Sequence, residues 1–161
     1  MFNLKAEFYL KIIFLFSFIA LISAFFIEYI LGHQPCNLCL IERIPYGLSI
    51  MIIMAIFLIR KNQKFLVMLL ILTFIFSFAI SFYHFGIEQG FFQESSVCGV
   101  KSSTEIVTKE DLLKQLSEKT ISCKDVTFRI FGLSLTSINI VISLLFIITL
   151  LKIFKKYEKN K

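Results

Sequence analysis

Four cysteines are the residues of this chain best suited to chemistry, and they form two pairs. Cys36 and Cys39 make a C-x-x-C motif, whereas Cys98 and Cys123 lie far apart in a later segment. A disulfide between Cys36 and Cys39 closes a very small ring, which removes little chain entropy from the unfolded state and so stabilises a fold poorly. Cysteines at this spacing suit a redox centre, in which a reactive thiolate exchanges electrons with other thiols. We therefore predict a redox-active Cys36–Cys39 disulfide.

The elements that position these cysteines are long apolar blocks. Hydrophobic residues make up 57% of the 161 residues and charged residues only 17%, whereas an ordinary soluble domain has about 25% charged residues. This composition excludes a disordered chain, a collagen-like fibre and a basic nucleic-acid-binding domain. A bilayer core about 30 Å thick takes about 20 helical residues. We therefore predict a single all-α membrane domain over 1–161, with four spans at about 12–31, 38–59, 65–85 and 131–151.

The first two spans need a further argument. The first apolar block is too long for the apolar region of a signal peptide, which has about 7–15 residues, and no cleavage pattern follows it. We therefore expect it to remain as a span. The uninterrupted apolar run at 46–59 gives only about 21 Å of helix, so we extend the second span back to residue 38, beside the first cysteine pair.

The charges predict which way the spans face. Four spans place both termini on one side, together with the loop at 60–64. That side carries ten Lys and Arg against two Glu, and the opposite side seven against nine acidic residues, which together give the net charge of +6. Because Lys and Arg near span ends stay in the cytoplasm, we predict cytoplasmic termini in a bacterial inner membrane. The segments 32–45 and 86–130 then form two periplasmic redox loops.

This orientation places all four cysteines in a compartment where disulfides persist. Cys98–Cys123 is then a natural second disulfide, because a loop of roughly 45 residues builds little core unaided. Three connectivities are possible for four cysteines. A four-cysteine zinc site is an alternative, but the usual second C-x-x-C is missing and an oxidising compartment disfavours thiolate ligands. We expect no metal.

The residues after the first pair favour a reactive Cys39. If the helix begins near Leu38, Cys39 lies in its first turn, where unpaired amides and the helix dipole stabilise a thiolate. Arg43 follows one turn later on the same face, where it could stabilise that thiolate or hydrogen-bond a carbonyl of a membrane-borne ligand. An interfacial position or an ion pair with Glu42 is an equal alternative for Arg43.

Several neighbouring residues predict local structure. Gly32 suits a left-handed end of the first helix, and Pro45 predicts a kink in the second. Gly86 and Gly90 indicate the exit from the third helix. Thr108, followed by acidic residues, predicts a short amphipathic loop helix at about 109–118, lying on the bilayer surface.

A titratable side chain, His84, closes the third span, and Glu88 follows it one helical turn later. A histidine at the membrane edge could handle protons in a redox step. From the residues alone, an interfacial polar side chain bonded to its neighbours is the favoured alternative.

These motifs together resemble the DsbB family, the disulfide bond formation proteins of bacterial inner membranes. The resemblance covers nearly the whole chain. It is carried by the P-C-x-x-C-x-x-E-R string from Pro35 to Arg43, by His84 and by the later cysteine pair. It implies a protein dithiol:quinone oxidoreductase that reoxidises a DsbA-like periplasmic thiol oxidase and passes the electrons to ubiquinone or menaquinone.

The resemblance also implies roles for single residues. Cys98–Cys123 would accept electrons from the thiol oxidase, with Cys98 forming the mixed disulfide. Cys123 would then exchange with Cys36, and Cys39 would contact the quinone.

Arg43 matches the family's quinone-side arginine, and His84 matches a histidine near the same site. Two departures from the family pattern are Pro45, two residues after Arg43, and the absence of Trp from the chain.

Two other functions compete with this one. A four-helix membrane scaffold or transporter subunit could carry two structural disulfides, although Glu28 is the main ionisable residue within the spans and a transport path needs more. A thiol oxidoreductase resembling the vitamin K epoxide reductase group would carry its C-x-x-C in the last helix, whereas here the motif opens the second.

Overall fold

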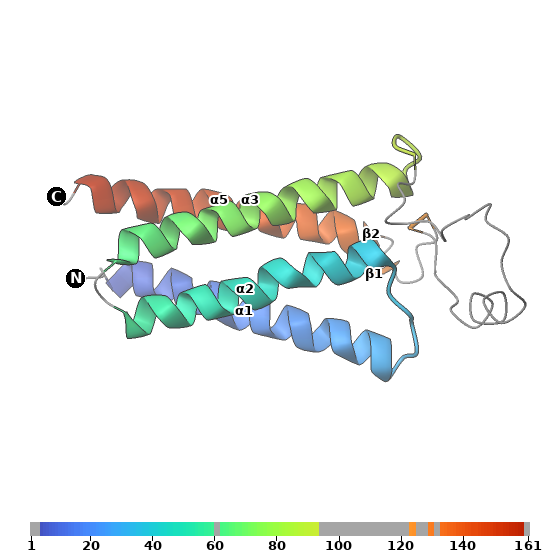
Figure 1. Cartoon of the computed structure of the whole chain (residues 1–161), viewed down its shortest axis with the longest axis horizontal. Helices are drawn as coiled ribbons and strands as arrows, with labels where there is room; N and C mark the ends of the chain where they lie inside the picture. The colour runs from blue at the N-terminus through green and yellow to red at the C-terminus, as the bar shows by residue number, and fades with distance from the viewer. Residues whose placement is uncertain (1–3, 60–61, 94–122, 125–128, 131–132, 160–161) are drawn as a thin grey trace, which may run out of the picture.

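The computed structural model describes residues 4–59, 62–93, 123–124, 129–130 and 133–159. Nearly all of these residues belong to four long helices that run side by side (Figure 1). The helices are α1 (Leu4–Tyr29), α2 (Asn37–Leu58), α3 (Gln63–Glu88) and α5 (Leu135–Lys159). Both termini lie at one end of the bundle, and the α1–α2 connection lies at the other. The predicted all-α four-helix bundle is confirmed.

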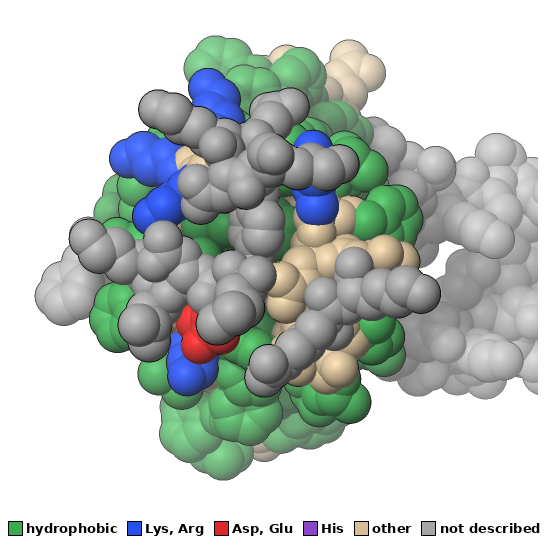
Figure 2. Space-filling view, turned by 90° about the vertical axis from the view of Figure 1, so that its left-hand side faces the viewer, with side chains coloured by type: hydrophobic (Ala, Val, Ile, Leu, Met, Phe, Trp, Pro, Cys, Tyr) green, Lys and Arg blue, Asp and Glu red, His purple; other side chains and the backbone are tan. Residues whose placement is uncertain are grey.

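Each of the four helices is long and apolar enough to cross a membrane. Large hydrophobic side chains such as Phe18, Met51 and Ile75 cover their outer faces, as expected for surfaces that contact lipid. Figure 2 shows the end that carries the termini, where Lys and Arg side chains lie around a largely hydrophobic surface. The exposed lysines described there are Lys11, Lys64, Lys152, Lys155 and Lys156.

The start of α5 differs from the expected span, which began at residue 131. Arg129–Ile130 (β1) pairs with Leu133–Ser134 (β2) as a short antiparallel ribbon. The Ser134 hydroxyl then accepts a hydrogen bond from the Ser137 amide at 3.3 Å, as an N-cap does. Apolar composition predicted an earlier helix, but the ribbon and this serine cap delay it to Leu135.

Glycines end α1 and α3 as their sequence positions suggest, with one exception. Gly32 has a φ of +70° after α1 and Gly90 a φ of +77° after α3, both in the left-handed region that favours glycine. Gly86 does not end α3, which continues to Glu88. A Cβ at Gly86 would lie 2.1 Å from the Phe92 ring, so glycine here leaves room for the chain that folds back after the helix.

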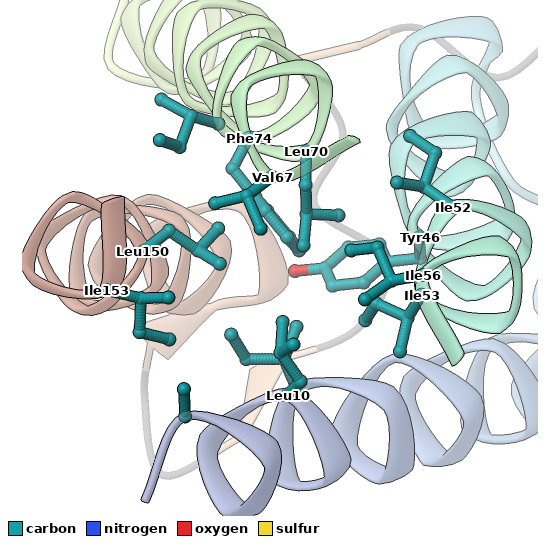
Figure 3. Packing of buried hydrophobic residues seen from close by; sticks show 13 residues of the cluster. Leu10, Tyr46, Ile52, Ile53, Ile56, Val67, Leu70, Phe74, Leu150 and Ile153 are labelled. Atoms are coloured by element: carbon teal, nitrogen blue, oxygen red, sulfur yellow. The ribbon is translucent and has the colours of Figure 1, made fainter. Parts of the chain in front are cut away.

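The hydrophobic core occupies the half of the bundle nearest the termini. Figure 3 shows side chains of all four helices meeting there. The core includes Leu10, Ile53, Ile56, Val67, Leu70, Phe74 and Leu150. Buried hydroxyls lie further along the bundle, in the pairs Ser49–Ser17 at 3.0 Å and Ser143–Ser77 at 3.2 Å. The apolar half therefore fixes the helices, and the polar half carries the groups described next.

Candidate active site

The C-x-x-C motif lies at the very start of α2. Cys36 is the N-cap, with φ −71° and ψ 166°, and its sulfur accepts a hydrogen bond from the Cys39 amide at 3.3 Å. The sequence placed the helix start near Leu38 and therefore gave Cys39 the benefit of the first-turn amides. The helix begins at Asn37, and the residue that accepts a first-turn amide is Cys36.

Both sulfurs of the motif are free thiols, and they lie 2.8 Å apart. This separation exceeds the length of a disulfide bond, which is about 2.05 Å. As two thiols, the pair is two electrons more reduced than the predicted Cys36–Cys39 disulfide. The disulfide stays a prediction for the oxidised form of the same pair.

His84 on α3 lies behind Cys36. Its Nε2 is 3.6 Å from the Cys36 sulfur, and its side chain is only 2% exposed. The sequence favoured an interfacial His84 at the membrane edge, but the structure buries it between α2, α3 and α5. Its neighbours are a thiol and carboxylates rather than lipid headgroups.

The hydrogen bond from the Cys39 thiol is the main reason why the pKa of Cys36 is lowered, from 9.0 to about 4. Burial acts in the opposite direction, and the hydrogen bond from His84, the Cys39 amide and the charge of His84 add to the lowering. The N-terminal end of a helix stabilises negative charge in the same way. In the dithiol form these contacts therefore favour a thiolate on Cys36, with the Cys39 thiol as its donor.

Glu42 is a site residue that sequence reasoning considered only as a partner for Arg43. Its Oε1 is 2.9 Å from His84 Nδ1, and its Oε2 accepts a hydrogen bond from the Asn139 amide at 3.0 Å. The available signal was an acidic residue one helical turn after Cys39 in an otherwise apolar stretch. Such a residue is expected to need a buried partner.

Glu88 and Thr136 complete the surroundings of His84. The Thr136 hydroxyl donates to Glu88 Oε1 at 2.7 Å and lies 3.3 Å from His84 Nδ1. Glu88 Oε1 is 3.9 Å from His84 Nε2. Glu88 Oε2 is buried and has no hydrogen-bond partner among the described residues. His84 therefore faces carboxylates from both α2 and α3.

Arg43 turns away from these groups and toward α1. Its guanidinium forms an ion pair with Glu28, and its central carbon lies 5.3 Å from the centroid of the Phe25 ring. The partner of Arg43 is thus Glu28 on another helix, and the alternative pair with Glu42 is wrong. The Arg43 side chain keeps 17% of its surface exposed, at the end of the bundle that carries Cys39.

Cys123 lies beside the first cysteine pair. It is disulfide-bonded and belongs to one buried cluster with Cys36, Leu38 and Ile87, against which Cys39 packs. Cys98 and the predicted loop helix at 109–118 lie outside the described residues. The pairing of Cys98 with Cys123 stays a prediction.

Cys36, Cys39 and His84 also offer three ligand atoms within 4.8 Å of one another. Two thiolates on a tetrahedral zinc ion lie about 3.8 Å apart, since each Zn–S bond is about 2.3 Å. The 2.8 Å between the two sulfurs suits a shared proton better than a shared metal.

Comparisons with known proteins identify the family of the chain. The family model described as "Disulfide bond formation protein DsbB" matches residues 6–153. The chain is 32% identical over 147 residues to the uncharacterized protein RP370 of Rickettsia prowazekii (strain Madrid E). The matched region covers 90% of this chain and 86% of that protein. No solved structure matches the chain. The chain therefore belongs to the DsbB family, whose members are membrane oxidoreductases of disulfide bond formation.

Proposed function

We propose that this protein reoxidises a DsbA-like periplasmic thiol oxidase and passes the two electrons to a membrane quinone. The observation that carries the proposal is the place of Cys36. This thiol is buried at the N-terminus of a membrane-spanning helix, in contact with His84 and in one buried cluster with the disulfide-bonded Cys123. A site there can exchange electrons with protein thiols on one side and with a lipid-soluble acceptor on the other.

The proposed exchange begins in the later cysteine pair. A thiolate of the reduced oxidase attacks Cys98 of a Cys98–Cys123 disulfide, forming a mixed disulfide and releasing the Cys123 thiolate. Cys123 then attacks Cys36 of the oxidised motif, and Cys39 leaves as a thiolate. Thiol–disulfide exchange needs the attacking sulfur to reach its target, and the shared cluster of Cys123 and Cys36 supports this step.

The residues at the Cys39 end of the bundle fit a quinone. Arg43 is a permanent cation with an exposed fraction and can donate a hydrogen bond to a carbonyl, and the Phe25 ring lies beneath it. We propose that Arg43 holds the quinone and that Cys39, which is partly exposed, is the sulfur nearest to it. A bound quinone supplies a strong acceptor for two electrons and two protons.

A quinone is also the kind of acceptor that the energetics require. A DsbA-type oxidase has a potential of about −120 mV, and each 30 mV uphill costs about 1.4 kcal/mol for two electrons. Few disulfide acceptors could reoxidise it.

We further propose a bacterial inner-membrane location with both termini in the cytoplasm. The lysines at the end that carries the termini (Figure 2) support it, because basic residues near span ends remain cytoplasmic. The cysteine end of the bundle then lies at the periplasmic surface, where a soluble thiol oxidase is available.

A scaffold or transporter subunit with two structural disulfides remains the competing function. The buried His84–Glu42 pair behind Cys36 favours the enzyme, because a structural disulfide needs no titratable partner. Burying such groups costs free energy unless they are paired, and that cost is expected where chemistry uses them.

Reconstitution tests the proposal. Purified protein in detergent, a reduced DsbA-like oxidase and ubiquinone should together show loss of quinone absorbance and oxidation of the partner's thiols. The Cys36→Ser, Cys39→Ser double variant should show neither, and omission of quinone should stop turnover after at most two equivalents, one for each disulfide. Full thiol oxidation by the double variant would contradict the relay.

A further inference from the structure

We propose that Glu42 is a positioning residue that holds His84 against Cys36, so that Cys36 rather than Cys39 carries the negative charge of the dithiol form. The inference deepens the proposed function, on which it rests, by naming the charged sulfur of the reduced pair and the group that selects it. Glu42 does not touch the reacting sulfurs and acts through His84.

The two ring nitrogens of His84 have separate partners. Nδ1 is 2.9 Å from Glu42 Oε1, and Nε2 is 3.6 Å from the Cys36 sulfur. A carboxylate accepts but does not donate a hydrogen bond, so Glu42 requires the proton on Nδ1. Nε2 is then left to exchange its proton with Cys36. Turning the ring would break both contacts in a site that water hardly reaches.

Glu42 is itself fixed by α5. Asn139 donates one amide hydrogen to Glu42 Oε2 at 3.0 Å and another to the Ser81 hydroxyl at 2.7 Å. Its carbonyl oxygen accepts a hydrogen bond from the Tyr46 hydroxyl. With both donors and the acceptor engaged, the Asn139 amide has one favourable orientation. The hydrogen bonds that run from Asn139 through Glu42 and His84 therefore fix how the His84 ring faces Cys36.

Three groups share the charge of the site, with a net charge of −1. When the proton of Cys36 moves to His84 Nε2, the site holds a thiolate, an imidazolium and the Glu42 carboxylate. A buried imidazolium is stabilised by opposite charges on both of its nitrogens. Among the described residues Cys39 makes no hydrogen bond to His84, and its thiol is placed to donate to the Cys36 sulfur 2.8 Å away. The arrangement therefore favours charge on Cys36.

Glu88 is the other carboxylate that faces His84 and supplies a matched control. It lies on α3, with Oε1 3.9 Å from Nε2, the ring nitrogen that also faces Cys36, and the same Oε1 accepts a hydrogen bond from Thr136 of α5. If Glu42 acted only through its charge, removing either carboxylate would have a similar effect. If Glu42 acts by holding Nδ1, its removal should matter far more.

The test measures the reduced protein without quinone or thiol oxidase. Iodoacetamide labelling followed by peptide mapping gives the alkylation rate of Cys36 and Cys39 separately across pH. We expect Glu42→Gln to move the Cys36 midpoint upward by at least one pH unit, which is about tenfold in thiolate fraction at pH values below the original midpoint. Glu88→Gln should change the rate less than threefold.

A double-mutant cycle separates positioning from charge. His84→Gln should reproduce the loss of Glu42→Gln, and the double variant should lose no more than either single variant, because the two residues act as one unit. Equal effects of Glu42→Gln and Glu88→Gln, or additive effects of Glu42→Gln and His84→Gln, would overturn the proposal.

Asn139→Ala keeps the Glu42 carboxylate but removes the hydrogen bond that holds it. This variant replaces Glu42→Gln in the test if circular dichroism shows that Glu42→Gln does not fold. A smaller upward shift of the Cys36 midpoint is expected, and an unchanged pH profile in folded Asn139→Ala would count against the proposal. If the protein shows the expected labelling profile but no turnover with quinone, the result contradicts the proposed function and leaves the role of Glu42 supported.

Discussion

Arg43 of α2 and Glu28 of α1 form an ion pair that ties the helix after the C-x-x-C motif to the first helix. The two residues are far apart in sequence, and the pair places the cation beside the Phe25 ring rather than beside Glu42. The guanidinium is thereby held at the end of the bundle where Cys39 lies, with part of its surface open.

Replacing Arg43 should weaken quinone use. A hydrogen bond to a charged group contributes about 1.5–3 kcal/mol, so Arg43→Ala should raise the quinone KM between about tenfold and a hundredfold. The KM for the thiol oxidase should change much less. Arg43→Lys keeps the charge but loses the planar fork, so its quinone KM should lie between that of the unchanged protein and that of Arg43→Ala. An unchanged quinone KM in Arg43→Ala would remove Arg43 from the quinone site.

The pH dependence of the dithiol form should report the Cys36 thiolate. With a pKa of about 4 instead of 9.0, the alkylation rate of Cys36 should reach its plateau by about pH 5 and fall as pH drops through about 4. Because the folded pKa lies below the unfolded one, the thiolate stabilises the reduced protein fully above about pH 9 and loses that effect progressively down to about pH 4.

The effect on stability is tested by comparing the Tm of the reduced protein with that of Cys36→Ser. The difference in Tm between the two should narrow as pH falls from 8 to 4. A labelling midpoint for Cys36 near the ordinary thiol value would show that the buried contacts do not hold a thiolate.

Cys36 and Cys123 should form a disulfide when their usual partners are removed. In a Cys39→Ser, Cys98→Ser double variant, the two remaining sulfurs belong to one buried cluster, so mild oxidation should join them rapidly. The matched Cys36→Ser, Cys98→Ser variant leaves Cys39 and Cys123 and should react more slowly. Mass spectrometry of non-reduced peptides distinguishes the products. Faster bonding of Cys39 would reverse the proposed order of exchange.

Gly86→Ala should destabilise the end of α3 through Phe92. The added Cβ meets the Phe92 ring at 2.1 Å, and the ring must swing away from Tyr83, on which it stacks at 5.7 Å between centroids. Such aromatic pairs contribute about 0.5–1.5 kcal/mol, so a loss of about 1 kcal/mol is expected. In a Phe92→Ala background the same change should be neutral or stabilising, since alanine is the better helix residue. Equal losses in both backgrounds would rule out this contact.

A reporter fused after Lys161 tests the orientation. Cytoplasmic activity is expected, because the lysines of α5 and of the α2–α3 end lie on the side of the termini. The control is the same reporter inserted after Gly90, which should show periplasmic activity. Periplasmic activity of the Lys161 fusion would leave the cysteines in a reducing compartment and contradict the proposed function.

The sequence predicted the elements of this fold better than it predicted the contacts of the site. Three apolar blocks are long enough to span a bilayer whatever their neighbours, and the second becomes long enough once it is extended back to residue 38, so the bundle followed mainly from length. The left-handed backbone at Gly32 could also be predicted from the local sequence, because a helix end commonly requires a left-handed residue.

The contacts of the site depend on distant parts of the chain. Glu42, His84 and Asn139 meet only when α2, α3 and α5 pack, and no spacing in the sequence indicates that. The difference between Cys36 and Cys39 depends on where α2 begins, and helix boundaries are uncertain by one or two residues.

The position of Cys36 as the N-cap of α2 has a second consequence. Its sulfur is at once the acceptor for the Cys39 amide and the atom whose electrons change on oxidation. A thiolate is a stronger acceptor than a disulfide sulfur, so loss of two electrons weakens the first turn of the helix. Amide hydrogen exchange at Cys39 should therefore be slower in the dithiol form than in the oxidised form, and backbone protection there would follow the electron content of the protein.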